Sequence, residues 1–131
     1  MLNGAEEFDL GLTYSDGQGV AQDLKKALYW YEKAAEMGHA QAQSNLGQMY
    51  GDGEGVAQDD KQAVYWYEQA AEQGYAYAQT ALGERYRDGR GVDHDPKQAV
   101  YWFEKAAEQG DARSQANLEF MQTSLGELLK R

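Results

Sequence analysis

The sequence predicts an all-α solenoid of antiparallel helix pairs, and three observations support this fold class. A 36-residue unit recurs without insertion or deletion, and residues 41–76 and 77–112 agree at 23 of 36 positions. The chain has one proline and many Ala, Glu, Lys and Gln residues, which favour helix. Most of its 15 glycines recur at fixed places of the unit, where they mark helix ends. Units of this length cannot bury their apolar faces alone and stack on their neighbours.

This period predicts a single domain over residues 1–131. We expect full repeats at 5–40, 41–76 and 77–112, followed by a capping helix at 113–131.

The first helix of the second repeat is expected at Gln41–Gly51. Its apolar residues Ala42, Leu46 and Tyr50 recur at i, i+4 and i+8 and therefore share one face. Two glycines one residue apart follow, and they supply the positive φ that a tight exit from a helix requires. We therefore expect a loop at residues 52–56.

A glycine lies inside the first helix of each full repeat, where it costs about 1 kcal/mol relative to alanine. These residues are Gly11, Gly47 and Gly83. The repeated penalty indicates close approach of another backbone, and we expect it to be the small-residue face of the second helix, at Ala34/Ala35 and their equivalents. In the capping segment this position is Glu119, and no second helix follows it.

The second helix of the repeat is expected to run from an N-cap at Asp59 to about Gln73, with Gly74 as its left-handed C-cap residue. Both other repeats also have aspartate at the cap. In the third repeat Pro96 follows it, at the first helical position, where a missing N–H costs nothing. The apolar face of this helix is expected to gather Ala63, Val64, Trp66, Tyr67, Ala70 and Ala71.

The last segment predicts a helix that extends toward Leu129 and closes the stack. Its apolar residues recur at i, i+3, i+7 and i+10. They are Leu118, Met121, Leu125 and Leu128.

The repeated pattern includes Ala42-Gln43-x-x-Leu46-Gly47, then Gly53-x-Gly55-Val56, then Trp66-Tyr67-x-x-Ala70-Ala71 and Gly74. It resembles the Sel-one-like repeat (SLR) family, a relative of the tetratricopeptide repeat. The resemblance implies an α/α right-handed superhelix whose first helices line the concave side. It also implies an adaptor that binds proteins or peptides, since most members of this largely bacterial family do so. Some members are immunity proteins against toxins. A cysteine-rich branch is linked to β-lactam binding, but this chain has no cysteine to support that role.

Composition limits the partners and the compartment. A net charge of −10 disfavours nucleic acid and anionic membranes and favours a neutral or basic protein or peptide segment. The absence of cysteine excludes disulfides and thiolate metal sites. No apolar run approaches the ~20 residues of a membrane span, and the first residues do not resemble a signal peptide. We therefore expect a cytoplasmic protein by default, or a periplasmic or secreted domain if a leader was removed.

The sequence offers no catalytic group and no metal or cofactor site. The two histidines, His39 and His94, are expected in exposed loops, and the repeat places other residue types at both positions. The acidic loops at 52–60 and 88–95 superficially suggest calcium. However, Arg90 shares its position with Gln18 and Glu54, so a turn and helix-cap role fits them better.

One stripe of the first helices varies between repeats while the core positions hardly change. A solvated surface that has drifted would vary in the same way. The stripe also suits a peptide, because amides can pair with its backbone and aromatic residues can anchor its side chains. The candidate partner-binding residues are Gln41, Asn45, Gln48, Tyr77, Glu84, Asp88, Arg113 and Asn117.

The sequence therefore predicts a non-catalytic protein- or peptide-binding scaffold. The alternatives are a stoichiometric inhibitor or immunity-type protein, a segment of a longer scaffold and, less favoured, a hydrolase or β-lactam-binding protein. The repeated Tyr29, Tyr65 and Tyr101 predict either edge packing between successive second helices or a face for self-association. We accordingly expect a monomer or a weak homodimer.

Overall fold

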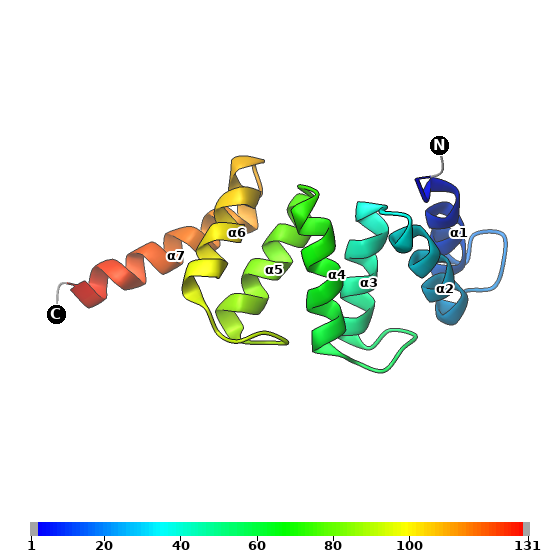
Figure 1. The fold of residues 1–131 in the computed structure, drawn as a ribbon, viewed down its shortest axis with the longest axis horizontal. Helices are drawn as coiled ribbons and strands as arrows, with labels where there is room; N and C mark the ends of the chain where they lie inside the picture. Colours follow the sequence, from blue (N-terminus) through cyan, green and yellow to red (C-terminus); the bar gives the residue numbers. More distant parts are fainter. Residues whose placement is uncertain (1–2, 130–131) are drawn as a thin grey trace.

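A computed structural model describes residues 3–129, with side chains up to Thr123. Within this range the chain forms helices and no strands, as predicted (Figure 1). The helices are α1 (Ala5–Asp16), α2 (Leu24–Glu36), α3 (Ala40–Asp52), α4 (Asp60–Glu72), α5 (Ala76–Asp88), α6 (Pro96–Glu108) and α7 (Ala112–Leu129).

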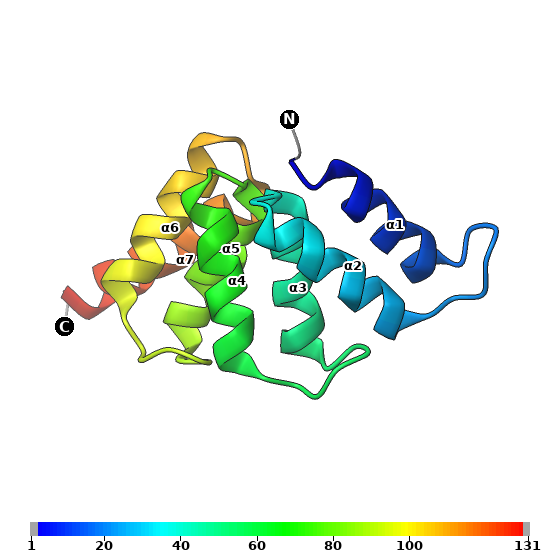
Figure 2. The same cartoon turned by 45° about the vertical axis from the view of Figure 1, so that its right-hand side comes forward.

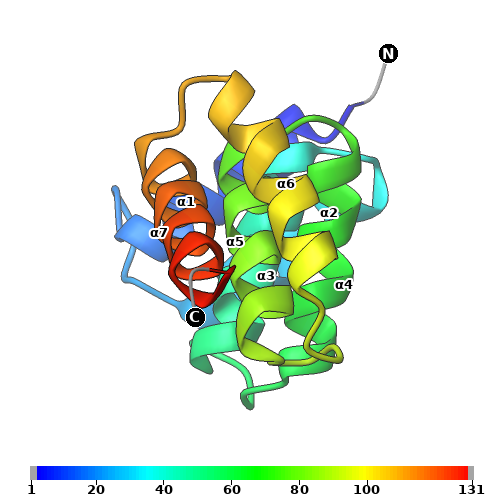
Figure 3. The same ribbon diagram turned by 90° about the vertical axis from the view of Figure 1, so that its left-hand side faces the viewer.

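The helices form two layers that advance together along the long axis of the molecule. The first helices of the repeats, α1, α3, α5 and α7, make one layer, which we call the A layer (Figure 3). The second helices, α2, α4 and α6, make the B layer (Figure 2). Each helix packs mainly against the helices before and after it in the chain, which is the arrangement of a solenoid.

The predicted helix ends are confirmed to within one or two residues. Asp59 accepts hydrogen bonds from the backbone N–H groups of Lys61 and Gln62, both at 3.1 Å, and so caps α4. Gly74 follows that helix at φ 92°, a conformation that favours glycine. Its N–H donates to the carbonyl of Ala71 at 2.9 Å, which satisfies one of the free carbonyls at the helix end.

The glycines inside the A-layer helices face aromatic rings, so the expected partner was wrong. A Cβ atom built on Gly47 would lie 2.7 Å from Cδ1 of Tyr67, and one on Gly83 would lie 2.6 Å from Cε1 of Phe103. Gly11 faces Tyr31 in the same way. The rings, and not the alanine face of the second helix, fill the space that a side chain would need.

The ends of the stack differ from its middle. Leu46 and Leu82 are fully buried, but the equivalent Leu10 is 40% exposed, since α1 is the first of the described helices. At the other end Leu118 is half-buried on α7, and Ser114 forms a buried 2.8 Å hydrogen bond with Thr80. The helix reaches Leu129 as predicted. The predicted contacts of Leu125 and Leu128 lie outside the described side chains.

A ladder of glutamine side chains ties each repeat to the next. The side-chain amide of Gln73 donates to the carbonyl of Gly38 at 3.0 Å and to Oε1 of Gln43 at 2.8 Å. Gln43 in turn donates to the carbonyl of Ala35 at 3.1 Å. The same set of bonds recurs 36 residues later, with Gln109, Gly74, Gln79 and Ala71 as its members. Buried backbone carbonyls at the helix turns therefore find partners across the repeat boundary.

Tyr29, Tyr65 and Tyr101 on the B layer each pack against a neighbour in their own helix. Each ring stands edge-on against the tryptophan next to it in the same helix, with centroids 4.9–5.1 Å apart. About half of each tyrosine remains exposed. They form an exposed row whose members are Tyr29, Tyr65 and Tyr101.

Candidate functional site

Two hollows lie next to each other along the A layer and share Gln48. The first has a volume of about 220 Å³ and lies among α1, α2 and α3. Its lining is apolar and polar, with one acidic group, and consists of Leu12, Ser15, Leu24, Tyr31, Asn45, Gln48, Met49 and Glu54.

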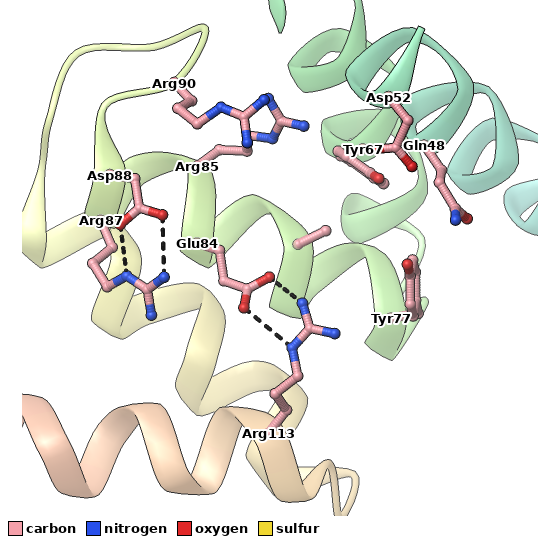
Figure 4. A pocket seen from close by; sticks show the side chains of 11 residues that line it. Gln48, Asp52, Tyr67, Tyr77, Glu84, Arg85, Arg87, Asp88, Arg90 and Arg113 are labelled. Carbon is pink, nitrogen blue, oxygen red and sulfur yellow. Dashed lines mark hydrogen bonds and ion pairs between the residues drawn. The ribbon is translucent and has the colours of Figure 1, made fainter. Parts of the chain in front are cut away.

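The second hollow has a volume of about 300 Å³ and lies among α3, α4, α5 and α7 (Figure 4). Its lining is strongly charged and consists of Gln48, Asp52, Tyr67, Tyr77, Ala81, Glu84, Arg85, Arg87, Asp88, Arg90 and Arg113.

The structure gathers most of the predicted binding residues along these hollows. Five of them line the second hollow: Gln48, Tyr77, Glu84, Asp88 and Arg113. Asn45 lines the first hollow beside Tyr31. Gln41 is exposed on α3 but lines neither hollow, and Asn117 is half-buried on α7 outside both.

Ion pairs hold several of these side chains. Arg113 on α7 forms a two-pronged pair with Glu84 on α5, and thereby bridges the third repeat and the capping helix. Arg87 pairs with Asp88 in the same way, and its Nη1 donates to Oδ1 of Asn117 at 2.9 Å. The hydrogen bonds from Arg87 lower the pKa of Asp88.

The sequence reasoning missed Arg85, Arg90 and their partner on α4. Nη1 of Arg85 and Nη2 of Arg90 both bind Oδ1 of Asp60, at 2.7 and 3.1 Å. These bonds lower the pKa of Asp60. The guanidinium of Arg85 also fills the space above Gly51, where a side chain would otherwise lie. The signal in the sequence was the cluster of three arginines within residues 85–90, opposite a glycine that the other repeats replace by larger residues.

His39 was expected in an exposed loop, and this prediction was wrong. It is half-buried and stacks on the ring of Phe8, with centroids 4.5 Å apart. Its Nδ1 accepts a hydrogen bond from the N–H of Ala42 at 3.1 Å and so caps α3. Burial lowers the pKa of His39, and the nearby Asp9 opposes this effect. His94 is exposed, as expected, and its Nδ1 lies 2.7 Å from the carbonyl of Arg87.

Within the described part of the chain, no three histidine, aspartate or glutamate residues come together as metal ligands. Among residues 3–129, no helix combines the length and apolar character that a membrane span requires.

A comparison with models of known families shows to which family the chain belongs. The family model described as the Sel1 repeat matches three consecutive segments, at residues 7–39, 40–75 and 76–111. The chain belongs to the Sel1 repeat family. The second and third matches begin one residue before the repeats expected from the sequence, at Ala40 and Ala76, where α3 and α5 also begin.

Solved structures of Sel1 repeat proteins share the fold. The chain is 46% identical to c5321, a protective antigen of uropathogenic Escherichia coli with an SLR fold, with a TM-score of 0.88 over 90% of this chain. It spans only 25% of that antigen. A Sel1 repeat protein of Oxalobacter formigenes is 39% identical, with a TM-score of 0.84, and 89% of this chain and 88% of that one are covered. Cysteine rich protein B of Helicobacter pylori is 25% identical, with a TM-score of 0.71 over 86% of this chain and 87% of that one.

A comparison with curated proteins gave no match. Sel1 repeats are helical scaffolds that generally mediate protein–protein interaction, and they are generally not catalytic.

Proposed function

We propose that this Sel1 repeat protein binds an extended segment of a partner protein along its A layer, without chemistry of its own. The observation that carries the proposal is the pair of adjoining hollows. They share Gln48, and together they run from α1 to α7. A strand-like or irregular peptide can lie across successive helices in this direction, and the rigid repeats lose little freedom when it binds.

The linings of the hollows support recognition of a polypeptide. Gln48 and Tyr77 are exposed, and Gln48 carries an amide that can both donate to and accept from a peptide backbone. Tyr77 offers an aromatic ring of the kind that anchors side chains at interfaces. Glu54 lines the first hollow and Asp16 lies near its Tyr31, so this end suits the neutral or basic segment that the net charge favours.

Site-specific photo-cross-linking tests the location of the binding face. A photoreactive phenylalanine analogue is placed at Gln48 or Tyr77 in the A layer, and at Tyr65 in the B layer as the matched control. All three positions are exposed. Irradiation in extracts of the host should give one shared cross-linked partner from positions 48 and 77. A partner captured only from position 65 would contradict the proposal.

The affinity of the identified partner provides the quantitative check. Gln48→Ala combined with Tyr77→Ala should weaken binding by about 2 kcal/mol or more if these are central contacts. Lys61→Ala combined with Glu72→Ala, at exposed positions of α4, is the control and should leave binding intact. An adaptor will leave the partner active, whereas an inhibitor or immunity-type protein will abolish its activity at a one-to-one ratio.

The oligomeric state belongs to the same proposal. We expect a monomer or a weak homodimer, with the row of Tyr29, Tyr65 and Tyr101 as the self-association face. Sedimentation of the native chain and of a variant with all three changed to serine measures this directly. A dimer that persists in the triple variant would place the contact elsewhere.

A further inference from the structure

Four guanidinium groups converge on the second hollow. Arg85 and Arg87 come from the end of α5, Arg90 from the loop after it and Arg113 from α7 (Figure 4). Apart from Arg131, these are all the arginines of a chain whose net charge is −10. The hollow therefore gathers guanidinium groups beside the carboxylates of Asp52, Glu84 and Asp88.

The repeat does not need arginine at these positions. The first and second repeats form the same helices with Thr13 and Met49 in place of Arg85, and with Gln18 and Glu54 in place of Arg90. Since the fold tolerates such different residues, the arginines in the third repeat are free to serve recognition.

The four arginines differ in how they pair with the carboxylates around the hollow. Arg87 and Arg113 each have a carboxylate of their own, in Asp88 and Glu84. Arg85 and Arg90 instead share a single oxygen of Asp60. Because a guanidinium usually binds a carboxylate through two N–H groups, this sharing leaves donors available on both side chains.

The Arg85 side chain is held in place before any ligand binds. It is only 10% exposed, and its guanidinium carbon lies 5.9 Å from the centroid of the Tyr67 ring. Burial raises the pKa of Tyr67, so its hydroxyl remains a neutral donor. Among the described residues this hydroxyl has no hydrogen-bond partner, and the ring lies on the wall between the arginine pair and Gln48 (Figure 4).

We infer that the Arg85–Arg90 end of this hollow binds one carboxylate of the partner segment, supplied by an acidic side chain or by the C-terminus of the chain. Arg85 and Arg90 provide the charged donors, and Tyr67 provides a neutral one. The inference rests on the proposed function, and it adds an acidic anchor to a segment that is otherwise neutral or basic.

The charge balance favours a single negative charge over a phosphate dianion. Arg85 and Arg90 carry two positive charges and Asp60 and Asp52 two negative ones, so this end has no surplus charge to balance a dianion. Asp52 faces the arginine pair from α3 and repels any second negative charge (Figure 4). This arrangement restricts the acidic group to the arginine side of the hollow.

Small carboxylates test the site by nuclear magnetic resonance. The probes are N-acetyl-glutamate α-amide for a side chain and N-acetyl-glycine for a chain terminus. N-acetyl-glutamine amide is the neutral control. Both carboxylates should shift the Nε–Hε resonances of Arg85 and Arg90 to saturation, the neutral control should not, and the tighter carboxylate identifies the source. Inorganic phosphate binding more tightly than both carboxylates, or no saturable shift with either, would overturn the inference.

Variants drawn from the other repeats assign the binding to these side chains. Arg90→Gln introduces the residue of the first repeat and Arg85→Met that of the second, and each should weaken carboxylate binding about tenfold. Asp52→Asn should tighten it, whereas Lys97→Gln, at an exposed cation on α6, should leave it unchanged. Binding that survives in Arg90→Gln, or that weakens in Asp52→Asn, would contradict the inference. Arg90 is exposed, so its variant keeps the test valid if Arg85→Met unfolds.

The probes also separate this inference from the proposed function. If no carboxylate binds but the cross-linked partner still depends on Gln48 and Tyr77, the inference fails and the binding face stands. If the carboxylates bind but the partner cross-links only from Tyr65, the proposed function fails while the anion site remains.

Discussion

At the scale of single residues, His39 shows how one side chain links pH to the stability of the stack. Its unprotonated Nδ1 caps α3, and its ring packs on Phe8 of α1. Protonation would remove the acceptor and place a charge in a half-buried site. Burial accordingly lowers the pKa of the folded residue below its usual 6.5.

We expect the stabilising contribution of His39 to be fully present above pH 6.5 and to be lost as the pH falls through the lowered pKa of the folded residue. His39→Asn, whose amide oxygen can cap without titrating, should remove this pH dependence. Urea unfolding at a series of pH values measures it. His94→Asn, at an exposed histidine that caps no helix, is the control. Parallel curves for the native chain and His39→Asn would refute the prediction.

Gly47 illustrates a steric constraint at the same scale. Gly47→Leu would drive a side chain into the Tyr67 ring and should cost several kcal/mol, more than the ~1 kcal/mol gained in helix propensity. Thermal unfolding measures the change. Glu119→Leu, at the equivalent exposed position of α7, should be nearly harmless. In a Tyr67→Ala background the cost of Gly47→Leu should shrink, and an unchanged cost would show that the ring is not the obstacle.

At the scale of helices, the sequence predicted the elements well and their contacts less well. Asp59 and Gly74 marked the ends of α4 because caps and positive φ have local chemical causes. The helical wheel placed Trp66 and Tyr67 on one apolar face, but it did not distinguish which ring faces the glycine of α3. The structure buries Tyr67 there and leaves Trp66 half-buried. Such a choice depends on how two helices cross, which the pattern of a single helix does not contain.

The glutamine ladder gives a prediction at this scale. Gln73→Met introduces the residue that the first repeat has at this position, Met37, and removes the donor for both the Gly38 carbonyl and the buried Gln43 amide. We expect a loss of about 1–3 kcal/mol, because the abandoned acceptors remain partly shielded from water. Chemical unfolding measures it. Gln62→Met, at an exposed position of the same helix, is the control, and an equal effect of both changes would contradict the prediction.

At the scale of the whole molecule, the sequence predicted a variable stripe that the structure places along the hollows, but not the arginines beside it. Tyr77, Glu84 and Arg113 were found because their stripe varies between repeats, and all three line the second hollow. Arg85 and Arg90 were assigned to no site, since each looked like an ordinary polar residue of one repeat. The two side chains come together only in the fold, because α4 and α5 meet across a repeat boundary and both side chains bind Asp60.

The capping helix α7 covers the last full repeat of the stack. Solenoid stability comes largely from interfaces between neighbours, and α7 supplies the last one through the buried Thr80–Ser114 hydrogen bond and the half-buried Leu118. Ending the chain at Gly110 should therefore lower the whole unfolding transition by about 10 °C or more and promote aggregation through the uncovered apolar side of the last repeat. Calorimetry and light scattering measure both effects. A chain ending at Thr123 keeps Ser114, Leu118 and Met121 and should lose much less. If the chain that ends at Gly110 stays monomeric with an unchanged melting temperature, α7 does not cap the stack.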